Sequence, residues 1–118
     1  MVSINEAERL FNEAINYINI NSFEQAEIKL EKAYKLLPKK ISIILNFSSV
    51  LINLKKLDKA YDILNLGIEE NPKNTDILLN IATILMLKKK FSEAIKIINQ
   101  IKEIDPKINE AYAKLGSC

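Results

Sequence analysis

Apolar residues along this chain recur at steps of three and four, which is the spacing of one face of an α-helix. The clearest example is Phe23–Pro38, FEQAEIKLEKAYKLLP, in which Ala26, Leu30 and Ala33 fall on one face. Short polar breaks such as Asn19–Ser22 separate one such stretch from the next. The pattern predicts helices over about residues 3–18, 23–37, 41–54, 57–71, 75–87 and 91–104, and a seventh that begins near Lys107.

The stretch that opens with Phe23 returns twice at an interval of 34 residues, which also separates Ala26, Ala60 and Ala94. A sharp period of this length is typical of stacked supersecondary units, none of which can bury its apolar face alone. Each unit here holds two predicted helices joined by a short turn, so the sequence predicts an all-α solenoid of antiparallel helix pairs. The same interval separates the bulky residues that open each second helix and the prolines that follow it: Phe23, Leu57 and Phe91, and Pro38, Pro72 and Pro106.

Polar residues at the breaks predict where individual helices begin and end. Ser3 stands three residues before Glu6, the spacing of a capping box at a helix start. Thr75 is expected to cap the first helix of the third unit. Lys55-Lys56 and Lys88–Lys90 are expected to form the turns inside the second and third units.

Large and small residues alternate within the third unit at Leu78, Ile81, Ala82, Leu85, Phe91, Ala94, Ile98, Ile101 and Pro106. This order resembles the tetratricopeptide repeat (TPR) family, and the likeness covers nearly the whole chain. Three positions depart from the family pattern: Glu13 stands where Leu is preferred, and Gly67 and Ile101 stand where alanine is usual. The resemblance implies a single domain over residues 1–118 that forms a right-handed superhelix of seven helices: repeat 1 at about 7–40, repeat 2 at 41–74, repeat 3 at 75–108 and a capping helix at 109–118.

In TPR stacks the first helix of each pair lines a concave groove. In the second unit this implies that Ile44, Phe47, Ser48 and Leu51 face the core. The opposite face carries a column of asparagines at the repeat interval, which resembles the asparagine ladders that hold a peptide backbone in some TPR proteins. The alternative is a chance alignment on a solvated face, since the chain has 13 asparagines. The expected groove contacts are Asn12, Asn46, Asn80, Ser49, Thr83, Lys114, Leu45 and Asn53.

Apolar residues flank this column in two rows that could either belong to the core or offer side-chain pockets to a partner. They are Phe11, Leu45 and Leu79, and Ile18, Ile52 and Met86.

Chaperone-binding TPR domains use a clamp of lysines, an arginine and asparagines to grip a terminal carboxylate. Phe11 and Ile15 occupy the first-unit places of that clamp, and Asp76 and Asn80 replace its third-unit cations. Only Asn46 matches the clamp, so recognition of chaperone C-termini is not expected.

Two hypotheses for function follow. In the first, the chain is a non-enzymatic interaction module that holds an extended peptide or partner segment in the groove. In the second, it is a self-associating scaffold, or a fragment of a longer TPR protein, that assembles through Ala111, Tyr112 and Leu115. No enzyme is expected, because no nucleophile lies beside a base and no glycine loop could hold phosphates.

Composition narrows the partners further. The 118 residues hold 17 basic and 15 acidic side chains, and this net charge of +2 does not favour nucleic acid. The lysine turns could form a basic edge, although solvated turns explain them more simply. With no histidine and a single cysteine, Cys118, neither a metal site nor another cofactor is expected, and a cytoplasmic location fits. No apolar run is long enough to span a membrane.

Overall fold

The computed structural model describes residues 2–106 of the chain. Within this range every predicted helix is present, and each boundary agrees to within one or two residues. The predicted seventh helix lies outside the described residues, as do Lys114, Ala111, Tyr112 and Leu115. The six helices are α1 (Val2–Asn19), α2 (Phe23–Leu36), α3 (Ile41–Asn53), α4 (Leu57–Glu70), α5 (Thr75–Leu87) and α6 (Phe91–Ile104).

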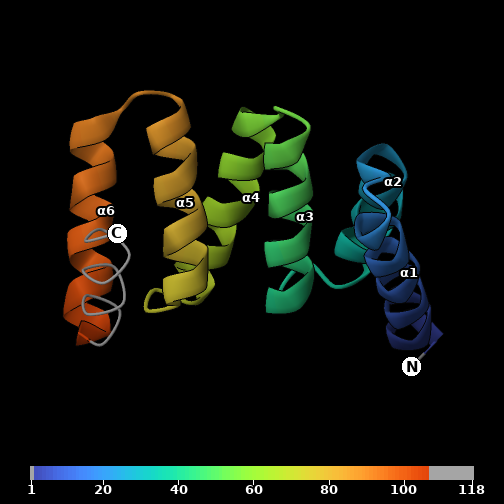
Figure 1. Cartoon of the computed structure of the whole chain (residues 1–118). Coiled ribbons are helices and arrows are strands. Elements are labelled where there is room, and N and C mark those ends of the chain that lie inside the picture. Colours follow the sequence, from blue (N-terminus) through green and yellow to red (C-terminus); the bar gives the residue numbers. More distant parts are fainter. Residues whose placement is uncertain (1, 107–118) are drawn as a thin grey trace.

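Consecutive helices pack as pairs, α1 with α2, α3 with α4, and α5 with α6. The pairs are joined by contacts of α2 with α3 and of α4 with α5, and α3 also contacts α5. Figure 1 shows the resulting stack, which runs from the α1–α2 pair at one end to α6 at the other, with α4 behind α3 and α5. The predicted all-α solenoid of helix pairs is therefore confirmed.

Small residues allow the helices of each pair to approach closely. Ala14, Ala26, Ala60 and Ala94 are fully buried, and Ser48 is the buried polar residue of the described core. Large side chains fill the space between these contacts, as close packing of a protein interior requires. The predicted core set of α3 is confirmed, because all of its members are buried: Ile44, Phe47, Ser48 and Leu51.

Helix α3 buries more residues than its predicted core face contains. Ile43 and Val50 are also buried, at 2% and 1% exposure. They are buried because α3 is an interior helix that contacts α2, α4 and α5. Ile43 packs with Leu10 of α1 and Ala33 of α2, and so it joins the first pair to the second.

The turn inside each pair has the same backbone geometry in all three units. Asn21, Lys55 and Lys89 adopt left-handed conformations, with φ of 61°, 66° and 63°. The amide of the following residue donates to a carbonyl five residues back, as Ser22 does to Tyr17 at 2.8 Å. The left-handed residue itself donates a second hydrogen bond to a carbonyl three residues back, as Asn21 does to Ile18 at 3.0 Å. These two bonds form the Schellman motif, which ends many helices. The predicted lysine turns are present, and each contains one lysine in the left-handed conformation.

Two predicted helix caps are wrong. The cap of α5 is Asn74, whose side-chain oxygen accepts a hydrogen bond from the Ile77 amide at 2.9 Å, and Thr75 is the first helical residue. Asparagine is at least as good an N-cap as threonine, and Asn74 is the residue that directly precedes the helix. Asn74 therefore caps α5. Helix α1 begins at Val2, which places Ser3 inside the helix and not at its cap.

Candidate functional site

The first helices α1, α3 and α5 carry twelve side chains at repeat spacing that the core does not bury. We call these the first-helix face. None of them is buried, whereas most of the intervening positions of α3 and α5 belong to the core. In four rows across the repeats they are Glu8, Ser42 and Asp76; Asn12, Asn46 and Asn80; Ile15, Ser49 and Thr83; and Asn19, Asn53 and Leu87.

Most of the predicted groove residues lie on this face. Among the described residues they are Asn12, Asn46, Asn80, Ser49, Thr83 and Asn53. Leu45 lies beside them and is half-buried, with its side chain packed against the core. The structure therefore places these polar residues on one surface, whereas Leu45 packs mainly against the core beneath it.

The three asparagines of the central row differ in their hydrogen bonds. Asn46 donates from Nδ2 to the Ser42 carbonyl of its own helix at 2.8 Å. Asn80 donates across the repeat boundary to the Ser48 hydroxyl oxygen at 3.4 Å. Asn46 has no such partner, because the residue equivalent to Ser48 in the first repeat is Ala14. Asn80 therefore has a structural contact that the sequence pattern did not reveal.

Neighbouring polar side chains of the face also donate within their own helices. Asn53 donates from Nδ2 to the Ser49 carbonyl at 3.0 Å, and the Thr83 hydroxyl donates to the Leu79 carbonyl at 2.9 Å. The amide oxygens of Asn46, Asn53 and Asn80 accept no hydrogen bond from any described residue. They are acceptors available to an incoming N–H group.

The first-helix face carries only negative charge among its described side chains. Glu8 and Asp76 are both exposed, and no lysine or arginine occupies any of the twelve positions. The positions of the carboxylate clamp, which include Phe11 and Ile15, likewise hold no cation. The face therefore suits a neutral or basic segment better than an acidic one.

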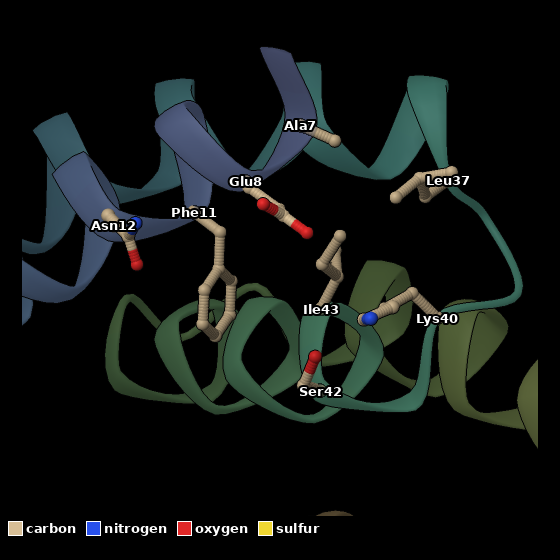
Figure 2. A pocket seen from close by; sticks show the side chains of 8 residues that line it. All are labelled: Ala7, Glu8, Phe11, Asn12, Leu37, Lys40, Ser42 and Ile43. Atoms are coloured by element: carbon tan, nitrogen blue, oxygen red, sulfur yellow. The ribbon is translucent and has the colours of Figure 1, made fainter. Parts of the chain in front are cut away.

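A hollow opens between α1 and α3 at one end of this face, and we call it the α1–α3 hollow. Its volume is about 220 Å³. Figure 2 shows that its side chains come from both helices and from the connection between α2 and α3. The sequence pattern does not predict the hollow, because Leu37 and Lys40 reach it only through the packing of one repeat on the next. Its lining residues are Ala7, Glu8, Phe11, Asn12, Leu37, Lys40, Ser42 and Ile43.

Two further hollows lie along the second helices at equivalent places in successive repeats. One of about 180 Å³ includes Tyr34 and Ile44, and one of about 600 Å³ includes Ile68 and Leu78. Equivalent residues line both hollows: Pro38 and Lys39 line the first, and Pro72 and Lys73, which lie 34 residues later, line the second. Such equivalence is what the stacking of similar units produces.

The flanking apolar rows divide into two groups. Phe11, Leu45, Ile18 and Ile52 are half-buried and pack against the core, which favours the structural role for them. Leu79 and Met86 are exposed at 39% and 47%. Of the six, these two are the most exposed to a partner, and Phe11 also lines the α1–α3 hollow.

The described residues hold no group of three or more histidine, cysteine, aspartate or glutamate side chains placed to bind a metal ion. None of the helices between residues 2 and 106 is sufficiently long and apolar to cross a membrane.

The fold and the face define a helical-repeat protein with an open, largely polar surface along its first helices. Two models of the tetratricopeptide repeat match the sequence, one over residues 41–74 and the other over residues 67–117. Together these matches cover more than half of the chain, and the chain belongs to the TPR family. No curated protein sequence is significantly similar to it.

Solved TPR domains have the same fold. The TPR domain of Arabidopsis OM64 superposes with a TM-score of 0.82 at 14% identity, covering 89% of this chain and 87% of that one. The TPR2B domain of yeast Sti1, in a complex with pHsp70, gives 0.80 at 19% identity over 94% and 89%. The first TPR domain of Spaghetti (RPAP3), bound to an HSP90 peptide, gives 0.79 at 22% identity over 92% and 94%. At these identities the likeness concerns the fold alone.

Proposed function

We propose that this chain is a non-enzymatic interaction module that holds an extended segment of a partner protein on its first-helix face. The observation that carries the proposal is the row formed by Asn12, Asn46 and Asn80, which stays unburied in three successive repeats. An extended segment presents N–H and C=O groups at regular intervals, and asparagine amides can pair with either. Binding through the peptide backbone is therefore compatible with the geometry of the face.

Similarity to solved TPR domains supports a protein-interaction function. The related domains of Spaghetti and Sti1 are described in complexes with an HSP90 peptide and with pHsp70. The present chain has Asp76 and Asn80 where the clamp of chaperone-binding domains has cations. An acidic chaperone tail is therefore not the expected partner, because Glu8 and Asp76 would repel it.

The test compares two asparagine pairs that lie on different faces of the stack. In the first variant, Asn12→Ala/Asn46→Ala, the amides are removed from the first-helix face. The control, Asn65→Ala/Asn99→Ala, removes two asparagines that are also 34 residues apart but lie on α4 and α6. Alanine has the higher helix propensity, so neither variant should melt below the parent.

Affinity capture from a lysate of the source organism supplies the measurement. We expect a protein that is retained by the parent and the control, and whose recovery falls at least fivefold with Asn12→Ala/Asn46→Ala. Equal recovery by all three would contradict the proposal. Recovery of this chain's own copies alone would favour the self-associating scaffold, which the exposed Phe91 and Ile95 of α6 also suit.

A further inference from the structure

The α1–α3 hollow combines an apolar floor with a rim of opposite charges. Its floor consists of Ala7, Phe11, Leu37 and Ile43, and Ala7 and Ile43 are among the buried core residues. Figure 2 shows the Glu8 carboxylate extending toward the hollow from α1 and the Lys40 ammonium group extending toward it from the connection between α2 and α3. An apolar group that entered the hollow would therefore lie between a negative and a positive charge.

Both rim charges lack an ion-pair partner within residues 2–106, unlike the charged residues beside them. Arg9 pairs with Glu6 and Glu13, and Lys39 pairs with Glu70 at 3.9 Å. Glu8 and Lys40 form neither a salt bridge nor a side-chain hydrogen bond with any described residue. The charges are thus available to groups on a bound molecule.

We propose that this hollow is a specificity pocket that takes one aliphatic side chain of an extended partner segment, with a basic residue and an acidic residue on either side of it. The inference rests on the proposed function, because the segment would lie along the first-helix face. In an extended chain, side chains two positions apart point to the same side. The basic residue would face Glu8 and the acidic residue would face Lys40, each two positions from the aliphatic one.

Asn12 and Ser42 complete the pocket on the side toward the rest of the face. Asn12 is exposed and Ser42 is half-buried, and both line the hollow. Their polar groups lie where the backbone of such a segment would leave the pocket, and they can pair with its N–H and C=O groups. The pocket thus selects the side chains, and the polar rows of the face hold the backbone.

Four synthetic peptides, acetylated and amidated, serve as probes for the full chain. Each has seven residues in a Gly/Ser background with leucine at the centre. The first peptide carries Lys and Glu two positions before and after the leucine, and the second carries them in the opposite order. The third has serine at both places, and the fourth keeps the charges of the first but has serine in place of the leucine. Binding is followed by NMR chemical-shift titration of the ¹⁵N-labelled protein.

We expect one of the two charged leucine peptides to bind most tightly and to shift the amide signals of Phe11, Asn12 and Ile43. Exposed ion pairs contribute modestly, so the uncharged peptide should bind two- to fivefold more weakly. Glu8→Gln should remove the advantage given by the peptide's lysine, and Lys40→Gln the advantage given by its glutamate. The control variants Glu24→Gln and Lys32→Gln change exposed charges of α2 and should have no effect.

Two results would contradict the proposed specificity pocket. One is equal affinity for the charged and uncharged leucine peptides, and the other is chemical-shift changes confined to residues outside the hollow. Asn46→Ala distinguishes this failure from failure of the proposed function. If the face holds the peptide backbone, Asn46→Ala weakens all leucine peptides by the same factor, whatever their charges. Charge-dependent binding that Asn46→Ala leaves unchanged would support the pocket and contradict the backbone-holding role of the asparagine row.

Discussion

At the scale of single residues, the repeat imposes the same left-handed backbone conformation on one residue of each turn. Asn21, Lys55 and Lys89 have φ between 61° and 66° at equivalent places. Asparagine tolerates this conformation well, whereas a lysine side chain crowds its own backbone there. The repeat interval predicted where the turns lie, but lysine has no intrinsic preference that would predict a positive φ.

Lys55→Gly and Lys89→Gly should each raise the free energy of unfolding by about 1 kcal/mol, because glycine adopts positive φ without a steric penalty. Both side chains are exposed, so little packing is lost. For a chain of this size the melting temperature should rise by about 3–5 °C per substitution. Thermal unfolding followed by circular dichroism measures the change.

Asn21→Gly is the matched control at the equivalent turn. It should change the melting temperature by less than either lysine substitution, since asparagine already tolerates the left-handed region. Equal gains at all three turns, or a loss at Lys55 and Lys89, would show that the lysine side chains stabilise the turns by contacts that outweigh the backbone strain.

At the scale of helices, Gly67 marks a close approach of α4 to α3 and α5. A Cβ atom at this position would lie 3.3 Å from Ile44 Cγ2 and 3.4 Å from Ile77 Cδ1. The equivalent residues are Ala33 in the first repeat and Ile101 in the third, and both of these are buried. The sequence revealed Gly67 as a departure from the family pattern, but only the structure shows that α3 and α5 together close the space.

Gly67→Ile, which installs the residue of the third repeat, should lower the free energy of unfolding by more than about 2 kcal/mol, because Ile44 and Ile77 already fill the site. Gly67→Ala should stay within about 1 kcal/mol of the parent, since its gain in helix propensity offsets a small displacement of Ile44. Urea unfolding of both variants provides the values. Equal stability of the two variants would mean that the repeats can move apart at little cost.

At the scale of the whole molecule, ion pairs join the stacked helices on the surface. Lys59 pairs with Glu31 at 2.6 Å, and Lys88 pairs with Asp58 of the preceding repeat. Hydrogen bonding from these lysines lowers the pKa of Glu31 and of Asp58 below their ordinary values of 4.5 and 3.8. Within the first pair, hydrogen bonding from Lys29 lowers the pKa of Glu13.

These shifts predict how stability depends on pH. A carboxyl group whose pKa is lower in the folded chain favours folding above its ordinary pKa, and this contribution is lost as the pH falls through the folded value. The melting temperature should therefore decrease as the pH falls below about 4.5. Because the groups are exposed, 1 M NaCl should weaken the dependence.

The variant Glu13→Gln/Glu31→Gln/Asp58→Asn checks the source of this dependence. Its melting temperature should change less between pH 6 and pH 3 than that of the parent. A parallel decrease in the parent and the variant would assign the acid sensitivity to other carboxylates.

The repeat period was sufficient to predict the helix pairs within residues 2–106, because Ala26, Ala60 and Ala94 and the three prolines specify both the packing and the ends of each pair. It also predicted which asparagines share a face. It could not predict the hydrogen bond from Asn80 to Ser48 or the position of Lys40 at the α1–α3 hollow. Both depend on how each repeat packs on the next. Periodicity describes what the repeats have in common, and these features arise where the repeats differ.

Binding of a partner along the first helices can be detected by methyl NMR spectroscopy of the chain with a captured partner segment. Exposed or half-exposed methyl groups report on both faces: Ile15 and Leu79 on α1 and α5, and Ile28, Leu66 and Ile95 on α2, α4 and α6. We predict that titration shifts the signals of Ile15 and Leu79 and leaves those of Ile28, Leu66 and Ile95 in place. Shifts confined to Ile28, Leu66 and Ile95 would contradict binding along the first helices.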